Sequence, residues 1–172
     1  MIVRKERDAD IEAIRAVNDA AFKQPGEGML VDALRANGGV MLSLVAQEDG
    51  PAGAIVGHIL FSPVTVEAES GRFGAAGLAP LAVLPDKQSQ GIGSRLVRDG
   101  LDLVRRKGVP GCVLLGSPKY YSRFGFDRAS RIGLYWKTQP TETEHFLMVE
   151  LTPGTPFGRG GLVSYRPEFD TV

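Results

Sequence analysis

The sequence predicts a mixed α/β fold, with a central twisted mixed sheet of about six to seven strands flanked by helices. Three observations lead to this prediction. Short apolar runs alternate with stretches of helical periodicity along the chain. An amphipathic helix over residues 91–107 lies between two buried apolar runs, which is the pattern of a βαβ unit with parallel strands. The pair Asp49-Gly50 separates two further strand-like runs and is typical of a hairpin turn.

Length and composition are those of one globular domain over residues 1–172. Hydrophobic residues make up 43% of the chain and charged residues 23%. Twenty Lys and Arg balance twenty Asp and Glu, which argues against a dedicated nucleic-acid binder and against a polybasic membrane anchor. The single cysteine, Cys112, excludes an internal disulfide and a thiolate metal cluster, so we expect no metal.

The charged first residues and the lack of an apolar run of roughly 18 residues argue against a signal peptide or membrane span. We therefore expect a cytoplasmic protein with neither nucleic acid nor membrane as a partner. The first strand is expected at residues 2–6, with Asp8 as the N-cap of the following helix. That helix has an apolar stripe, Gln24-Pro25-Gly26 ends it, and a second helix containing Leu30 and Leu34 ends near residue 38.

The middle of the chain predicts strands at residues 40–47, 52–66 and 75–84, the last almost wholly apolar and therefore central. After the helix over residues 91–107 comes a short buried strand at 112–115. A short helix is expected at 118–124, and strands at 126–135 and 145–151. The tail over residues 152–172 is rich in Pro and Gly and is expected to be irregular, with an edge strand at 162–165 that could mediate a homodimer.

The turn between the central strand and the long helix is a predicted anion site. The first four amides of a helix have no internal partner and carry the positive end of its dipole. Gly91 and Gly93 would let a phosphate approach the backbone closely. A Walker A loop is excluded because no Gly-Lys-Ser/Thr occurs here, and a dinucleotide fingerprint is excluded because Leu96 stands where its third glycine would be.

The spacing Gln88-x-x-Gly91-x-Gly93, within Leu-Ala-Val-x-Pro-x-x-Gln-x-x-Gly-x-Gly-x-x-Leu, resembles the pyrophosphate-binding signature of the GNAT superfamily of acetyl-coenzyme-A-dependent acyltransferases. A second segment, Tyr120-Tyr121-x-Arg123-Phe124-Gly125-Phe126, is similar to a later motif of that family. The order of elements also agrees, and the resemblance covers roughly residues 2 to 151. It implies a GNAT-like acyl-CoA N-acyltransferase fold with acetyl-CoA as co-substrate.

The resemblance also implies the cofactor contacts. The backbone of Leu81, Ala82 and Val83 would pair with the pantetheine arm, and an amide there would polarise the thioester carbonyl. The pyrophosphate would be held by the main-chain amides of the following turn, at Gln88, Ser89, Gln90, Gly91, Ile92, Gly93 and Ser94. The cofactor would enter where the central strand and the strand at 112–116 diverge.

Tyr121 is the expected catalytic residue. A phenol titrates near pH 10 and a thiol near 8.5, so a tyrosine beside the departing sulfur can stabilise or protonate it. The alternative is a core tyrosine that packs beside Phe124 and Phe126. The general base is left unassigned: His58 fits a structural histidine better, and Glu27 a solvated helix surface. Cys112 is expected to behave as a small buried hydrophobe.

Two classes of function are consistent with the sequence. The leading hypothesis is an enzyme that moves an acetyl group from acetyl-CoA to a primary amine of a small molecule or peptide, by direct attack in a ternary complex. The alternative is an acyl-CoA-binding regulatory module without turnover. An acyltransferase with a hydroxyl acceptor or a longer acyl chain would use the same cofactor site. Arg72, Trp136 and His145 could line an acceptor pocket, on location alone.

Overall fold

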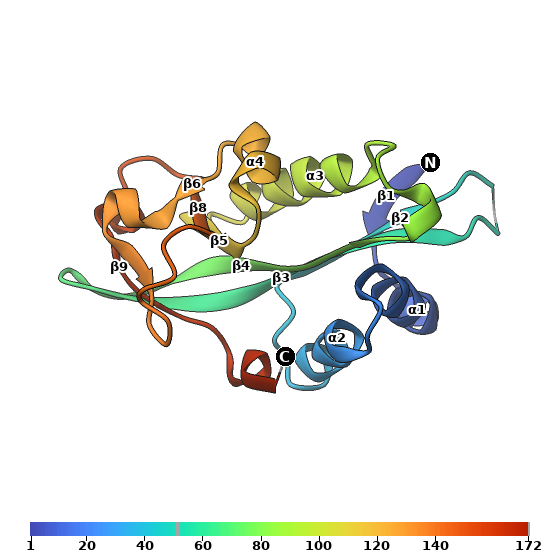
Figure 1. The fold of residues 1–172 in the computed structure, drawn as a ribbon, viewed down its shortest axis with the longest axis horizontal. Coiled ribbons are helices and arrows are strands. Elements are labelled where there is room, and N and C mark those ends of the chain that lie inside the picture. The colour runs from blue at the N-terminus through green and yellow to red at the C-terminus, as the bar shows by residue number, and fades with distance from the viewer. Residues whose placement is uncertain (51, 172) are drawn as a thin grey trace. The chain divides into compact units, whose positions relative to one another are not determined.

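The computed structural model describes residues 1–50 and 52–171 and has the expected mixed α/β architecture (Figure 1). The strands are β1 (Ile2–Lys5), β2 (Leu42–Gln47), β3 (Ile55–Ala68), β4 (Gly71–Val83), β5 (Gly111–Leu115), β6 (Asp127–Arg128), β7 (Leu134–Trp136), β8 (Phe146–Glu150) and β9 (Gly161–Ser164). The α-helices are α1 (Ile11–Phe22), α2 (Gly26–Ala36), α3 (Ile92–Arg106) and α4 (Pro118–Tyr121). Six short 3-10 helices join them within the described residues: η1 (Asp8–Asp10), η2 (Pro85–Lys87), η3 (Ser122–Phe124), η4 (Ala129–Ile132), η5 (Pro156–Arg159) and η6 (Pro167–Thr171).

The strands form one mixed sheet, which confirms the predicted fold class. Its order is β1-β2-β3-β4-β5-β8-β6, and β9 pairs with both β3 and β7. In the described residues the sheet has nine strands, more than the six or seven expected, because short segments such as β6 and β7 also pair. As predicted for a βαβ unit, β4 and β5 are parallel. None of the described helices combines the length and apolar character needed to cross a membrane.

The chain divides into two compact units, and the first comprises Met1–Ser62, Ala79–Gly100 and Pro167–Val172. Helices α1 and α2 cover one face of its strands, and the start of α3 covers the other (Figure 1). Successive residues of β3 point to these two faces in turn. Leu60 packs in the apolar cluster beneath α1 and α2, whereas the ring of Phe61 lies against Gly100 of α3.

The second unit comprises Pro63–Leu78 and Leu101–Arg166. Here β8 pairs antiparallel with β5 and with β6, and β9 lies between the end of β3 and β7. Its core is formed by ten buried residues: Val64, Val66, Ala75, Val113, Ala129, Leu134, Phe146, Met148, Phe157 and Val163. A Cβ at Gly111 would overlap the ring of Phe157, so the absence of a side chain there lets the tail close over β5.

Three local predictions are wrong. Asp8 does not cap α1: it opens η1, and α1 begins at Ile11 with Asp10 before it. Residues 126–135 do not form one strand, because η4 and then Gly133, at φ +71°, interrupt the pairing. The tail strand is not an edge strand, because β9 is paired on both sides. The sequence argument for a homodimer through that edge therefore no longer applies.

Candidate active site

The strand-to-helix turn after β4 offers backbone donors to an anion. The first backbone hydrogen bond of helix α3 is donated by the Arg95 amide to the Gly91 carbonyl, at 3.0 Å. The amides that precede Arg95 in the first turn therefore have no acceptor within the helix. Within the described residues, no backbone carbonyl accepts from the amides of Ser89, Gln90 or Gly91 either. All three residues are exposed. The turn is thus an accessible run of free amides at the positive end of a helix dipole.

Glycine at position 91 is explained by the backbone conformation. Gly91 has φ +84°, in the left-handed region that residues with a Cβ rarely adopt, and no heavy atom lies within 4 Å of where a Cβ would be. The space in front of this turn is therefore open to a ligand. Two side-chain hydrogen bonds stabilise the turn: Gln88 Nε2 donates to the Val83 carbonyl at 3.1 Å, and Gln90 Nε2 donates to the Asp86 carbonyl at 3.2 Å.

Strand β4 leads into this turn, and burial alternates at its C-terminal end: Pro80 and Ala82 are buried, whereas Leu81 and Val83 are partly exposed. The pairing of β4 with β5 comprises only Ala76–Cys112 and Gly77–Val113. Among the described residues, Leu78 and Leu114 do not pair with each other, and Leu114 pairs instead with Leu147 of β8, so the two parallel strands diverge beyond this point.

Tyr121 lies at the end of α4, directly after β5. Its ring packs edge-on against Tyr120, Phe124 and Phe126, with ring centroids 4.9, 6.2 and 5.7 Å away. A Cβ at Gly116 would lie 2.5 Å from Tyr121 Cε2, so glycine is required there for the ring to lie over the end of β5. Burial raises the pKa of Tyr121 well above its usual value, so the phenol stays protonated at neutral pH and can donate a hydrogen bond.

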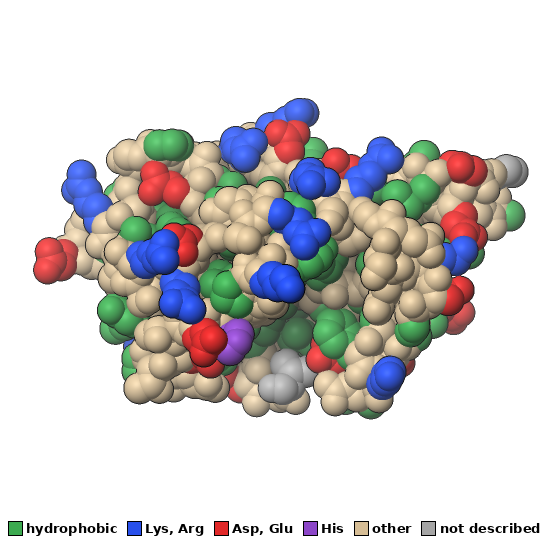
Figure 2. All heavy atoms as spheres, turned by 45° about the horizontal axis from the view of Figure 1, so that its top comes forward, with side chains coloured by type: hydrophobic (Ala, Val, Ile, Leu, Met, Phe, Trp, Pro, Cys, Tyr) green, Lys and Arg blue, Asp and Glu red, His purple; other side chains and the backbone are tan. Residues whose placement is uncertain are grey.

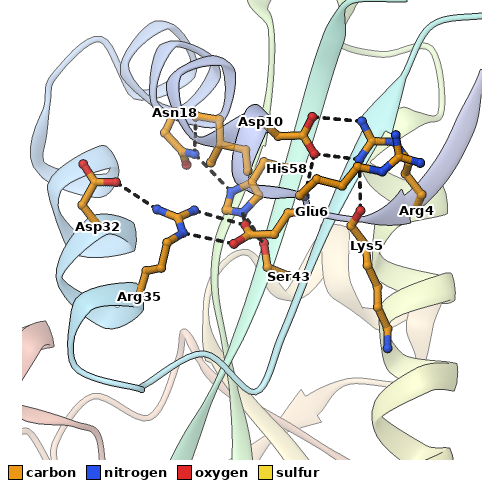
Figure 3. Close-up of polar contacts among 11 residues, drawn as sticks. Arg4, Lys5, Glu6, Asp10, Asn18, Asp32, Arg35, Ser43 and His58 are labelled. Carbon is orange, nitrogen blue, oxygen red and sulfur yellow. Dashed lines mark hydrogen bonds and ion pairs between the residues drawn. The ribbon is translucent and has the colours of Figure 1, made fainter. Parts of the chain in front are cut away.

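His58 is fully enclosed and belongs to a polar network between the sheet and the helices α1 and α2 (Figure 3). Asn18 Nδ2 donates to the Ile14 carbonyl at 2.9 Å and lies 3.1 Å from His58 Nδ1, which therefore accepts. The ring proton is on Nε2, 3.0 Å from Ser43 Oγ, and the Ser43 hydroxyl donates to Glu6. Burial lowers the pKa of His58 to about 4.

The same network ties α2 to the end of β1. Arg35 binds the Glu6 carboxylate through two nitrogens, each at 3.1 Å, and also contacts Asp32 at 3.0 Å (Figure 3). With both ring nitrogens satisfied and no surface exposed, His58 has a structural role and cannot take a proton from a substrate. Sequence reasoning missed Glu6 and Arg35, because 29 residues separate these partners and no local pattern links them.

The remaining sequence candidates are spread over the molecule. Glu27 lies in the first turn of α2, and its carboxylate accepts from Gln24 Nε2 at 3.1 Å. Arg72 is paired with Glu67 at 2.7 Å, and Trp136 stacks on Phe146. His145 lies 3.5 Å from Glu142 on the surface.

Cys112 is fully buried, and burial raises the pKa of its thiol far above the usual value. It therefore has neither the access nor the thiolate form that a nucleophile needs. In the part of the chain that the structure describes, no group of three or more His, Cys, Asp or Glu is arranged to hold a metal ion.

Comparison with known proteins agrees with these features. A family model described as "Acetyltransferase (GNAT) domain" matches residues 2–129. An uncharacterised N-acetyltransferase of Escherichia coli, YhbS, is 36% identical over 170 residues, 99% of each chain. The crystal structure of YhbS in complex with CoA has a TM-score of 0.89, with 34% identity and coverage of 98% of this chain and 91% of that one.

A second solved structure, a GNAT acetyltransferase of Brucella melitensis in complex with acetyl-CoA, is 41% identical, with a TM-score of 0.79. That comparison covers 98% of this chain and 97% of the Brucella chain. Both the family model and full-length relatives therefore match the chain that carries the glycine turn and the Tyr121 motif. On this basis, the chain belongs to the GNAT family of acetyltransferases.

Proposed function

We propose that the protein transfers an acetyl group from acetyl-CoA to a primary amine of a small molecule or peptide, by direct attack in a ternary complex within one domain. The observation that carries this proposal is the open run of free amides between β4 and α3, in a chain of the GNAT family. The relatives from Escherichia coli and Brucella melitensis, solved with CoA and acetyl-CoA, support acetyl-CoA as the donor.

The donor contacts follow from the accessible backbone. The amides of the turn, at Gln88, Ser89, Gln90, Gly91, Ile92, Gly93 and Ser94, bind the pyrophosphate. The backbone of Leu81, Ala82 and Val83 pairs with the pantetheine arm as an added strand would. An amide of this segment points at the thioester oxygen, where negative charge develops during attack, and so lowers the barrier.

Tyr121 acts as the general acid. The phenol is protonated at neutral pH, since burial raises its pKa, and it donates a hydrogen bond to the sulfur, and finally the proton, as the carbon–sulfur bond breaks. Direct transfer needs no acyl-enzyme, and the chain's only thiol, Cys112, is buried and protonated. Holding the amine against the thioester in one complex then supplies much of the rate enhancement.

The test is a panel of primary amines with acetyl-CoA, followed by the release of free CoA thiol. At least one amine should accelerate release, with the N-acetyl product in equal amount. Tyr121→Phe should lower kcat by about 100-fold, the smaller end of general acid catalysis, and leave the Kd for acetyl-CoA within about twofold. Full activity of Tyr121→Phe would refute the acid assignment.

The same assay, extended to alcohols as acceptors and to hexanoyl-CoA as donor, separates the alternatives. Acceleration by alcohols but not by amines would replace the amine acceptor with a hydroxyl. Turnover with hexanoyl-CoA but not with acetyl-CoA would change the donor. Binding of acetyl-CoA without turnover of any acceptor would favour the regulatory module.

A further inference from the structure

The second unit contains a cavity where the hairpin of β3 and β4 turns. Its volume is about 600 Å³, within the usual range for a small-molecule site. Residues 67–70 form one wall, residues 159–161, which lead into β9, form another, and Gly133 completes the lining. We call this cavity the hairpin pocket. All of its lining residues belong to the unit of Pro63–Leu78 and Leu101–Arg166, so one compact unit provides the whole site.

Backbone packing fixes the wall at residues 159–161. Gly160 has φ +83°, and a Cβ there would lie 2.4 Å from the Ile132 carbonyl oxygen and 2.6 Å from that of Gly133. The Gly161 amide donates to the Gly133 carbonyl at 3.1 Å. The two chain segments therefore contact each other through their backbones. At Gly133 itself no heavy atom lies within 4 Å of the Cβ position, so this part of the lining leaves room for a ligand.

The hairpin pocket lies at the end of its unit away from Tyr121. Strand β4 begins at Gly71, directly after the hairpin turn, and Gly77, six residues further on, pairs with Val113 of β5. At about 3.3 Å per residue, these six residues span about 20 Å. The Tyr121 ring lies over the far end of β5, further in the same direction. A molecule in the hairpin pocket is therefore out of reach of Tyr121 and is not the acetyl acceptor.

One charged residue of the lining is already paired. Acidic and basic side chains lie next to one another over the face drawn in Figure 2, and many of them form ion pairs. The two carboxylate oxygens of Glu67 accept from Lys137 at 2.8 Å and from Arg72 at 2.7 Å. These hydrogen bonds, that of Lys137 above all, hold the pKa of Glu67 below its usual value. Glu67 is therefore ionised, and two cations outside the pocket lining neutralise it.

The other two charged residues of the lining have no protein partner. Glu69 on the hairpin turn and Arg159 before β9 are exposed, and neither forms an ion pair or a side-chain hydrogen bond with any described residue. They belong to different walls of the pocket. The hairpin pocket thus offers one free carboxylate and one free guanidinium. A ligand with one ammonium and one carboxylate group would satisfy both.

We propose that the hairpin pocket binds a zwitterionic α-amino acid, with its carboxylate held by Arg159 and its ammonium group by Glu69. Arginine suits a carboxylate because its planar group donates two parallel hydrogen bonds to it. A ligand with a negative charge alone would be repelled by Glu69, and one with a positive charge alone by Arg159. The site shares no residue with the proposed donor site, and the inference does not depend on the proposed function.

The test is NMR titration of the ¹⁵N-labelled protein with each proteinogenic amino acid in turn. The backbone amides of Ser70, Gly133 and Gly161 report on the hairpin pocket. At least one amino acid should shift these signals saturably, with a Kd on the order of 1 mM or lower. Arg159→Gln and Glu69→Gln should each raise this Kd by about fivefold, the upper value for an exposed ion pair.

Ligands with a single charge test each partner separately. Propionate and n-propylamine each lack one of the two charged groups and should bind about fivefold more weakly than the best amino acid. Arg159→Gln should weaken the binding of propionate but not of n-propylamine, and Glu69→Gln the reverse. A matched control, Lys107→Gln/Glu144→Gln, removes an exposed cation and an exposed carboxylate elsewhere in the same unit and should leave every Kd unchanged.

Three results would overturn the proposal. The first is that no amino acid shifts the amides of the pocket. The second is that the shifts occur with a Kd that neither Arg159→Gln nor Glu69→Gln changes. The third is that propionate binds as tightly as any amino acid, which would make the pocket a simple anion site. Acetyl-CoA is absent from these titrations, so their failure leaves the acyltransferase proposal standing, and a failure to bind acetyl-CoA leaves this one standing.

Discussion

Acidification to pH 5 should destabilise the fold through one residue, His58. Its imidazole is neutral, fully buried and hydrogen-bonded on both nitrogens, and burial lowers its pKa to about 4 from the ordinary 6.5. Arg35 lowers this pKa further, and Glu6 opposes the shift. Between pH 6.5 and 4 the unfolded chain therefore binds a proton that the folded chain does not. Protonation stabilises the unfolded state, so the free energy of unfolding falls as the pH falls through this window.

The magnitude follows from the two pKa values. One pKa unit corresponds to about 1.4 kcal/mol, and the difference between the two states is fully expressed only below pH 4. From pH 7 to pH 5 the loss should be about 2 kcal/mol. Paired carboxylates add little to this loss of stability between pH 7 and pH 5. The pKa of Glu6, for example, is lowered from its ordinary 4.5 in the folded state, so the stability that this carboxylate contributes is lost mainly below pH 4.5.

The assay is urea unfolding at pH 7, 6 and 5, compared with His58→Gln. Glutamine is polar but does not titrate. The free energy of unfolding of His58→Gln should therefore fall by about 2 kcal/mol less than that of the wild type between pH 7 and pH 5. The comparison uses slopes against pH, which makes any overall loss of stability in the variant immaterial. Parallel pH profiles for the two proteins would refute the assignment of a buried neutral imidazole.

Two further predictions concern packing. Gly100→Ala should lower the free energy of unfolding, measured in urea, by about 1–2 kcal/mol. The new Cβ would lie 2.5 Å from the fully buried ring of Phe61, and this overpacking outweighs the gain of about 1 kcal/mol in helix propensity. A variant more stable than the wild type would show that the ring moves aside. The thiol of Cys112 should not react with a disulfide reagent in the native protein and should react fully in denaturant, whereas rapid native labelling would contradict its burial.

The region from β4 to α3 could be predicted because its signals are local and agree with one another. An apolar run ends at Pro85, two glycines follow, and a helical stripe begins, all within one continuous segment. The start of α1 could not be predicted in this way. The Asp10 carboxylate pairs with Arg4 at 2.7 and 2.9 Å and also accepts the Arg7 amide at 2.8 Å, which caps η1, so the chain makes a 3-10 turn before α1 begins.

In the candidate site, too, some residues are predicted by local motifs, whereas the role of others depends on partners that are distant in sequence. Tyr121 and the turn around Gly91 are motif residues, and sequence alone proposes their roles. The enclosure of His58 depends on Asn18 of α1, Ser43 of β2 and Glu6, which follows β1.

The central claim is that the turn after β4 binds the donor's pyrophosphate, and calorimetry tests it directly. Acetyl-CoA should be titrated into the wild type, Gly91→Glu and Gly108→Glu. Both glycines have positive φ, +84° and +78°, and open space at the Cβ position, so the two variants carry similar strain and the same charge. Binding by the wild type and by Gly108→Glu, lost in a folded Gly91→Glu, is the predicted result. Undiminished binding by Gly91→Glu would contradict the account.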